Sequence, residues 1–317
     1  MLQNEPATQD IIDAYERIKN YIHRTPILTS SALNSIFGCE LFFKCENMQK
    51  VGAFKFRGAS NAVLSMDKND LQKGVATHSS GNHAAALALA AKLQNIPAYI
   101  VMPGNAPQIK KAAVESYEGK TVFCEPTLQA REETLLRVVE KTGAVFIHPF
   151  DNYSIIAGQA TCAKEIYEDL TALDYIITPV GGGGLLSGTC LSTKYFSPNT
   201  KVIGAEPKGA DDTFRSIRDG KIHPSLNPKT ICDGLLTQLS NKTFTIIRNN
   251  VTKIITVEEE SIIKAMRMIW ERMKIIVEPS SAITLAVILE NKDQFTSKRI
   301  ALILSGGNVD LDNLPWN

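Results

Sequence analysis

Short apolar runs alternate with amphipathic stretches along most of the chain. Apolar runs that predict strands fall at 41–43, 74–77, 98–102, 121–123, 144–147, 175–177, 201–204 and 300–304. Amphipathic stretches that predict helices fall at 83–93, 110–117, 130–141, 155–169 and 258–273. This alternation is typical of parallel sheets with crossover helices, and nearly continuous apolar strands fit a sheet that is covered on both faces.

The same alternation fits either an open doubly wound sheet or an eight-fold barrel. A barrel needs about eight evenly spaced units, and the segment 211–251, rich in Asp, Lys, Asn and Pro, breaks that spacing. We therefore predict an α/β protein with two open, twisted, mostly parallel sheets flanked by helices. Because no linker separates two halves, we expect a small domain at 67–149 inserted into a large domain at 1–66 and 150–317.

The composition is that of an ordinary globular enzyme. Of 317 residues, 44% are hydrophobic and 21% are charged, which argues against disorder. The net charge of +1 offers no basic surface for nucleic acid or for an anionic membrane. We find neither an apolar run of the roughly 18 residues that span a bilayer nor a signal-peptide pattern. Six scattered cysteines without a CxxC pair predict free thiols and a cytoplasmic location.

Four consecutive glycines follow the predicted strand at 175–177. They are Gly181, Gly182, Gly183 and Gly184, and Leu185 and an amphipathic helix come next. Glycines leave backbone N–H groups unobstructed, and at a helix N-terminus such groups bind phosphate. The segment lacks the P-loop Gly-Lys-Ser/Thr and the framing of the dinucleotide fingerprint. It predicts a phosphate site, and the alternative is a tight strand–helix turn with packing glycines.

Lys55 lies between Phe54 and Phe56 at the start of a helical pattern. Desolvation by apolar neighbours lowers the pKa of a lysine and makes its neutral amine available as a nucleophile toward an aldehyde. Most lysines lie on solvated faces, so this residue alone does not decide between the two interpretations.

Two polar turns follow predicted strands. Ser79, Ser80, Gly81, Asn82 and His83 follow the strand at 74–77 and open a helix, where backbone N–H groups can bind a carboxylate. The alternative is an ordinary helix cap. The turn that begins at Ser305 follows the strand at 300–304, and open α/β sheets bind ligands at such strand ends. The alternative there is a surface turn.

In this order, the motifs resemble the fold-type II pyridoxal-phosphate enzymes, and among them the serine/threonine dehydratase and serine racemase group. The resemblance runs over essentially the whole chain. It rests on Thr25-Pro26, Phe54-Lys55-Phe56-Arg57-Gly58-Ala59, Ser79-Ser80-Gly81-Asn82-His83, Ala157-Gly158-Gln159, the four glycines and Ser305-Gly306-Gly307-Asn308. It implies a lyase or isomerase that acts on a small amino acid and forms a homodimer.

The resemblance also implies how pyridoxal 5′-phosphate is held. Lys55 would bind the cofactor covalently through its amine, and the four glycines with Leu185 would cradle the phosphate. Asn82 would bond to the ring oxygen, and Ser305 would face the ring nitrogen. A serine hydroxyl leaves that nitrogen largely neutral, which weakens the electron sink and favours elimination.

The implied reaction begins when the substrate amine displaces Lys55, which then removes the α-proton. The β-hydroxyl leaves as water, and hydrolysis gives a 2-oxo acid and ammonia. Ser80 matches the serine that stands on the opposite cofactor face in the racemases. Because racemisation needs bases on both faces, we expect a serine/threonine ammonia-lyase with serine racemase activity.

Substrate contacts are implied at several positions. They are Ser79, Ser80, Gly81, His83, Arg131 and Thr237. Arg131 could bind a second carboxylate as a fork, which keeps L-threo-3-hydroxyaspartate ammonia-lyase as the alternative activity. The pair Phe150-Asp151 resembles the dehydratases rather than the racemases.

Two further sites are implied. The segment 204–212 matches the divalent-cation segment of the group, with carboxylates from Glu206 and Asp212 and the carbonyl of Ala210. Oxygen ligands select magnesium, calcium or manganese, and the alternative is a solvated acidic turn. The resemblance also implies the site at which ATP activates eukaryotic racemases. Six positions match that site: Ser30, Ser31, Lys50, Tyr117, Lys274 and Asn308. Three positions depart from it, because Ile12, Val51 and Ala85 replace polar residues.

Two more distant functions share this fold. A β-replacement enzyme related to cysteine synthase is one, and the polar turn at 79–83 fits it poorly. A non-catalytic ligand-binding protein is the other, and Lys55 together with Ser305 argues against it. The sequence does not rank serine, threonine and hydroxyaspartate, because one methyl group changes binding by only about 1–3 kcal/mol.

Overall fold

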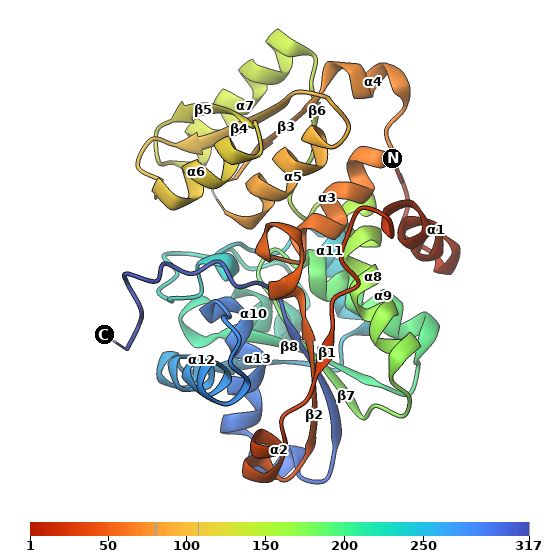
Figure 1. Cartoon of the computed structure of the whole chain (residues 1–317), viewed down its shortest axis with the longest axis vertical. Coiled ribbons are helices and arrows are strands. Elements are labelled where there is room, and N and C mark those ends of the chain that lie inside the picture. The colour runs from red at the N-terminus through yellow and green to blue at the C-terminus, as the bar shows by residue number, and fades with distance from the viewer. Residues whose placement is uncertain (80, 107, 317) are drawn as a thin grey trace.

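The computed structural model describes residues 1–79, 81–106 and 108–316. Its strands form two sheets, a six-stranded one in the order β1-β2-β10-β7-β8-β9 and a four-stranded one in the order β5-β4-β3-β6 (Figure 1). Only the edge pair β1–β2 is antiparallel among the strand pairs of the described residues. The predicted α/β class with two mostly parallel sheets flanked by helices is confirmed.

The strands of the two sheets have the following bounds. They are β1 (Ile27–Leu28), β2 (Glu40–Cys45), β3 (Val75–His78), β4 (Ala98–Pro103), β5 (Lys120–Cys124), β6 (Val145–Phe146), β7 (Tyr175–Pro179), β8 (Lys201–Pro207), β9 (Lys253–Val257) and β10 (Arg299–Leu304).

The helices cover the sheets and connect their strands. They are α1 (Thr8–Ile18), α2 (Ser31–Phe37), α3 (Lys55–Leu64), α4 (Lys68–Lys73), α5 (Asn82–Lys92), α6 (Gln108–Ser116), α7 (Leu128–Thr142), α8 (Tyr153–Asp169), α9 (Gly184–Phe196), α10 (Asp212–Asp219), α11 (Asn241–Asn250), α12 (Glu259–Met273), α13 (Pro279–Glu290) and α14 (Lys292–Phe295). Short 3₁₀ turns lie at Glu46–Met48, Lys50–Gly52, Lys208–Ala210 and Asp233–Leu235.

Apolar side chains on both faces of each sheet explain the nearly continuous apolar runs. One face of the larger sheet packs against α2, α12 and α13, and the other packs against α1, α8, α9 and α11. The smaller sheet lies between α3 with α5 on one face and α7 on the other. Figure 1 shows the smaller sheet above the larger one, with α3 between them.

The segment 211–251 contains more regular structure than we predicted. It includes α10 and α11, and β9 follows it as an edge strand paired with β8. An edge strand is covered less completely than a central one, and two polar residues, the exposed Lys253 and the partly exposed Thr256, interrupt the apolar run that would have signalled β9.

The carboxyl ends of the parallel strands gather the polar and glycine-rich turns of the sequence into one region. β7 leads into the glycine loop, β10 into Ser305 and β3 into Ser79. Open α/β sheets bind their ligands at such ends. The strands of the smaller sheet all fall within 67–149, while the domain boundaries themselves stay a prediction. Within the described ranges, no helix combines the length and the apolar character needed to cross a bilayer.

Candidate active site

Lys55 is the first residue of α3, and its half-buried side chain ends in an enclosed amine. The Nζ atom donates to the carbonyl oxygen of Pro149 at 3.2 Å and lies 5.1 Å from the centre of the Phe54 ring. Burial lowers the pKa of Lys55 to about 8, and the nearby Glu278 carboxylate opposes that shift. A substantial fraction of the amine is therefore neutral near pH 7–8, as a nucleophile or base requires.

Two glycines let α3 lie directly against α8. A Cβ atom on Gly158 would stand 2.6 Å from the Cα atom of Gly58, which real side chains do not tolerate. The Gly58 N–H also donates to Oε1 of Gln159 at 3.2 Å. The Ala157-Gly158-Gln159 motif therefore fixes the helix that begins at Lys55.

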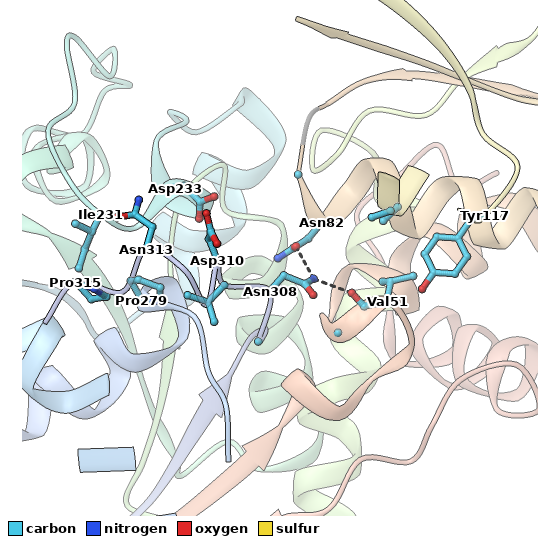
Figure 2. Close-up of a pocket in the computed structure, with 16 residues that line it drawn as sticks. Val51, Asn82, Tyr117, Ile231, Asp233, Pro279, Asn308, Asp310, Asn313 and Pro315 are labelled. Carbon is cyan, nitrogen blue, oxygen red and sulfur yellow. Dashed lines mark hydrogen bonds between the residues drawn. The ribbon is translucent and has the colours of Figure 1, made fainter. Parts of the chain in front are cut away.

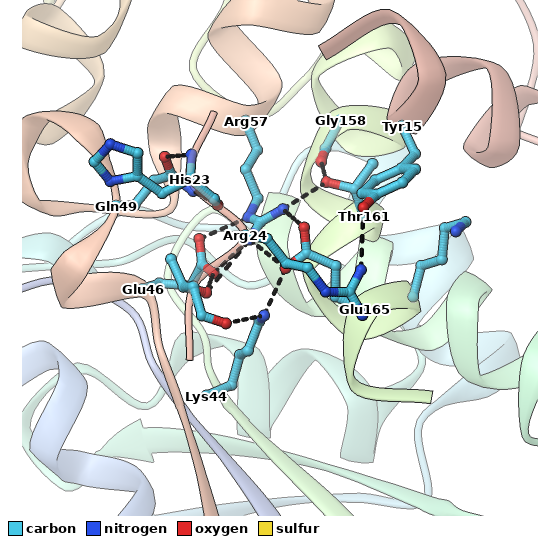
Figure 3. Close-up of polar contacts among 12 residues, drawn as sticks. Tyr15, His23, Arg24, Lys44, Glu46, Gln49, Arg57, Gly158, Thr161 and Glu165 are labelled. Carbon is cyan, nitrogen blue, oxygen red and sulfur yellow. Dashed lines mark hydrogen bonds and ion pairs between the residues drawn. The ribbon is translucent and has the colours of Figure 1, made fainter. Parts of the chain in front are cut away.

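A buried network of four charges holds the same helix from below (Figure 3). The guanidinium of Arg57 pairs with Glu46 through Nε at 2.7 Å and with Glu165 through Nη1 at 2.8 Å. Lys44 donates to Glu165 at 2.5 Å and to the carbonyl of Thr25 at 2.8 Å. All four charged side chains are fully buried. Two cations balance two anions, so the network anchors α3 without a net buried charge.

The glycine loop is closely surrounded by protein. Gly183 has a φ of +86°, in the left-handed region that favours glycine. A Cβ atom on Gly182 would lie 2.3 Å from the Phe150 ring, and one on Gly183 would lie 2.7 Å from Leu239. Both glycines precede α9, and the N–H groups of Gly182, Gly183 and Gly184 have no acceptor within the described part of the chain. The loop thus combines packing glycines with free backbone donors.

Ser305 follows β10 and is buried. Its hydroxyl lies 3.2 Å from the hydroxyl of Ser281, and its carbonyl accepts from the N–H of Phe54 at 2.9 Å. Since Phe54 directly precedes Lys55, this backbone hydrogen bond holds the start of α3 against the carboxyl end of β10.

Asn82, at the first turn of α5, belongs to a hydrogen-bonded chain between the two sheets. Its amide donates to both carboxylate oxygens of Glu278, at 3.1 and 3.3 Å. Its side-chain oxygen accepts from Asn308 at 2.9 Å (Figure 2). The backbone N–H of Asn308 in turn donates to Glu278 at 3.2 Å. Asn82 is thereby oriented from the side of the larger sheet.

The polar turn after β3 is placed at the same edge. The Gly81 N–H donates to the hydroxyl of Ser79 at 3.3 Å, and a Cβ atom on Gly81 would meet nothing within 4 Å. His83 is buried, and its Nε2 contacts the carbonyl of Ile147 at 3.2 Å. Burial lowers the pKa of His83 to about 3, so the ring is neutral and its Nδ1, which has no partner among the described residues, is an acceptor. Ser80, the predicted second base, lies outside the described residues.

The two outer substrate-contact candidates differ. Arg131 lies on α7 beside the strand ends, where its charge acts on His78 and on Cys124, the last residue of β5. Its Nε is buried and has no hydrogen-bond partner in the described residues. Thr237 is exposed, and no hydrogen bond joins it to Lys55 within the described part of the chain.

Glu206 and Asp212, the predicted cation ligands, are both buried next to the buried Ala210. Glu206 accepts from the N–H groups of Thr213 and Phe214 at 2.8 and 2.7 Å. Burial raises the pKa of Glu206 to about 8 and that of Asp212 to about 6. Oδ2 of Asp212 has no partner among the described residues, and no three acidic, cysteine or histidine side chains converge in that part of the chain.

A cleft of about 750 Å³ opens between the sheets beside Asn82 (Figure 2). Tyr117 and Asn308, two of the predicted nucleotide contacts, line it. The other four predicted contacts are not among the lining residues; Ser30 caps α2, and Lys50 directly precedes Val51, which lines the cleft. The described lining contains no lysine or arginine.

Sequence reasoning missed three contributors to this site. Glu278 contacts Asn82, but a lone glutamate before a proline carries no signal of its own. The carbonyl of Pro149 is a backbone group, which no side-chain pattern reveals. His148 precedes that proline and could have been suspected from its position after the strand predicted at 144–147.

The chain has close relatives among proteins of known activity. A profile described as pyridoxal-phosphate dependent enzyme matches residues 18–306. The chain is 51% identical to beta-hydroxyaspartate dehydratase of Paracoccus denitrificans (strain Pd 1222), over 98% of this chain and 99% of that protein. It is 52% identical to serine racemase of Dictyostelium discoideum, over 96% of each.

Solved structures agree with these relatives. Serine racemase from Dictyostelium discoideum superimposes with a TM-score of 0.92 at 51% identity, over 96% of this chain and 99% of that one. A threonine deaminase from T.th. also gives 0.92, at 41% identity and the same two coverages. The protein described here therefore belongs to the family of pyridoxal-phosphate dependent enzymes, as its motifs predicted.

Proposed function

We propose that the protein is an ammonia-lyase that converts serine or threonine to a 2-oxo acid and ammonia and also racemises serine. The observation that carries this proposal is the environment of Lys55, an amine with a pKa of about 8 at the meeting point of the two sheets. The relatives named as racemase, dehydratase and deaminase support it, because they use related reactions on small amino acids.

The residues around Lys55 fit pyridoxal phosphate. The free N–H groups of Gly182, Gly183 and Gly184 at the start of α9 suit its phosphate. The buried hydroxyl of Ser305 suits a neutral ring nitrogen, because it brings no charge. Asn82 offers an oriented amide for the ring oxygen. When bound, the cofactor supplies electron withdrawal from the α-carbon of the substrate.

Lys55 and the groups around it have separate roles in the proposed reaction. Lys55 takes the α-proton at Nζ, and the Pro149 carbonyl at 3.2 Å orients the free amine for that step. Burial keeps the amine partly neutral, so that it can accept a proton. His83 can accept a hydrogen bond at Nδ1, for which the described residues offer no donor.

Racemisation is proposed to need Ser80 on the opposite side of the substrate from Lys55. Changing Ser80 to Ala should reduce formation of D-serine from L-serine and turnover of D-serine much more than elimination from L-serine. Equal losses of all three activities would refute a role confined to one face.

L-threo-3-Hydroxyaspartate is the second candidate substrate, and Arg131 favours it. The Nε of Arg131 is buried without a partner in the part of the protein that the structure describes, and such burial is costly unless a ligand pairs with the group. A β-carboxylate would supply two acceptors for the guanidinium fork. The relative from Paracoccus denitrificans carries the name of that activity.

The proposed divalent-cation site is supported by Oδ2 of Asp212, which lacks a partner within the described ranges and belongs to the same segment as Glu206 and Ala210. A cation there would offset the cost of burying two carboxylates, whose pKa values burial raises. Magnesium, calcium or manganese should therefore raise the melting temperature, and Asp212→Asn should remove most of that increase.

ATP activation, a homodimer and a cytoplasmic location stay predictions. Tyr117 and Asn308 on the cleft support ATP, whereas the absence of basic residues from its described lining does not. Isothermal titration with ATP tests the first, and light scattering of the purified protein tests the second. The six unpaired cysteines fit a reducing compartment, and fractionation of cells tests the location.

Product analysis tests the proposed activity. Four substrates would be supplied with and without Mg²⁺: L-serine, D-serine, L-threonine and L-threo-3-hydroxyaspartate. The 2-oxo acid and the opposite enantiomer formed from each substrate would be measured. Pyruvate together with D-serine supports the proposal, and oxaloacetate formed much faster than pyruvate supports the second candidate. Cysteine formed from O-acetylserine and sulfide, without any 2-oxo acid, would overturn both.

Arg131→Met sharpens the choice of substrate. If Arg131 binds a β-carboxylate, the variant should lose about 10–100-fold in kcat/KM for hydroxyaspartate and little for serine. Arg137→Met on the same helix is the matched control, because Arg137 already donates to Thr134. Equal losses for both substrates would show that Arg131 does not select the second carboxylate.

A further inference from the structure

The segment from His148 to Asp151 joins the smaller sheet to α8 and contacts several parts of the site at once. The carbonyl of Pro149 accepts from Lys55 at 3.2 Å. The ring of Phe150 lies where a Cβ atom on Gly182 would be, so it packs against the glycine loop. The carboxylate of Asp151 pairs with Lys242 of α11 at 3.3 Å.

One side chain fixes the path of this segment. Nδ1 of His148 accepts from the backbone N–H of Asp151 at 2.8 Å and from that of Phe150 at 3.3 Å. The ring of His148 also stands edge-on to the Phe150 ring, with centroids 4.6 Å apart. The imidazole therefore closes a turn around Pro149 and contacts the Phe150 ring.

The protonation state of the ring is set by these contacts. A nitrogen that accepts two N–H bonds carries no hydrogen, so the hydrogen of the neutral ring is on Nε2. Burial lowers the pKa of His148 to about 4, which keeps the ring neutral at neutral pH. Nε2 has no acceptor among the described residues.

We infer that His148 is a positioning residue for the cofactor site, acting through Nδ1. It holds the turn that presents the Pro149 carbonyl to the amine of Lys55 and the Phe150 ring to the phosphate-binding glycines. Loss of the Nδ1 acceptor would free two backbone N–H groups and let both contacts drift together. This inference rests on membership of the pyridoxal-phosphate family, and it does not depend on which amino acid is the substrate.

Three substitutions separate the two ring nitrogens. In His148→Asn, the side-chain oxygen occupies nearly the place of Nδ1 and can accept the same N–H groups. In His148→Gln, the polar atoms reach the place of Nε2 instead. His148→Phe keeps the aromatic contact with Phe150 but has no acceptor.

The test is the rate at which the purified full-length holoenzyme loses its cofactor on dilution, followed by visible absorbance. We expect the Phe and Gln variants to lose the cofactor at least about tenfold faster than the wild type, and the Asn variant to stay within about threefold of it. Melting temperatures measured alongside show which variants are folded. If the Phe variant does not fold, the Asn and Gln pair decides.

Two outcomes would overturn the inference. Rescue by Gln but not by Asn would mean that Nε2 acts directly on a ligand. Cofactor retention equal to the wild type in the Phe and Gln variants would mean that the turn holds without its acceptor. Because cofactor retention is measured without substrate, neither outcome bears on the proposed lyase activity.

Discussion

Lys55 and Arg57 are two residues apart on α3, and their surroundings shift the pKa values of the two side chains in opposite directions. Burial opposes the charge of Arg57, but direct pairing with Glu46 and Glu165 outweighs it and raises the pKa of the guanidinium. Among the described residues, the amine of Lys55 donates to a neutral carbonyl, and burial lowers its pKa to about 8. The Glu278 carboxylate favours the charged amine and only moderates that shift.

The difference shows that burial alone does not make a cation reactive. Two carboxylates within hydrogen-bond distance turn a buried cation into an anchor, whereas a carbonyl leaves it ready to lose its proton. The pairing of Arg57 also holds the amine of Lys55 in place, because both residues belong to α3.

Removing the reactive charge should have the largest effect on activity. Lys55→Met is expected to lower kcat by at least about 10³-fold and to abolish the visible absorbance of the cofactor, because both the base and the attachment point are lost. Chemical denaturation of wild type and variant, both freed of cofactor, should show no loss of stability, since an incompletely paired buried amine is removed. Activity above that limit would contradict the role of Lys55.

Removing the anchoring charge should act mainly on folding. Arg57→Met leaves Glu46 and Glu165 buried with Lys44 as the remaining cation of the network, and we expect a loss of about 3–5 kcal/mol in the free energy of unfolding. Urea denaturation of wild type and variant measures it. A loss below about 1 kcal/mol would mean that the network does not hold α3.

Changing the Glu278 carboxylate should move the pKa of Lys55 without removing the amine. Glu278 raises that pKa, so Glu278→Gln should lower it from about 8. The pH dependence of Lys55 acylation in cofactor-depleted protein, followed by peptide mass spectrometry, reports it. Between about 8 and the ordinary value of 10.5 the unfolded chain binds more protons at Lys55, so its contribution to stability rises with pH there. An acylation midpoint near 10.5 in the wild type would contradict the burial argument.

A solvated ion pair gives the smallest effect and calibrates the comparison. Arg24 pairs with Glu168 at 2.8 Å and with Asp169 at 2.6 Å, but its side chain is 42% exposed. Arg24→Ala should cost no more than about 1 kcal/mol. If Arg24→Ala lowered the free energy of unfolding as much as Arg57→Met, the number of ion pairs, and not their burial, would determine how much a pair stabilises the protein.

Most central strands could be predicted because both of their faces are buried. The runs at 98–102 and 300–304 correspond closely to β4 and β10. The edge strand β9 was missed because polar residues interrupt its apolar run. Within 211–251, α10 and α11 were missed because a composition rich in turn-forming residues hides their amphipathic pattern.

The motifs of the site could be predicted, but the contacts that orient them could not. Lys55, the glycine loop and Ser305 stand out because small or polar residues interrupt apolar segments. The buried charges of Lys44 and Glu165 are far apart in sequence, and a charged residue ordinarily indicates solvent. Only the fold brings those charges together.

The six cysteine thiols differ in exposure, so one of them can be labelled selectively. Five of the six cysteines are buried, and Cys124 at the end of β5 is partly exposed. Burial raises the pKa of Cys124, although Arg131 opposes that shift, so a maleimide dye should attach there more readily as the pH rises. The unmutated enzyme would then carry a single fluorophore beside Arg131, and its emission could report substrate arrival at the smaller sheet in real time.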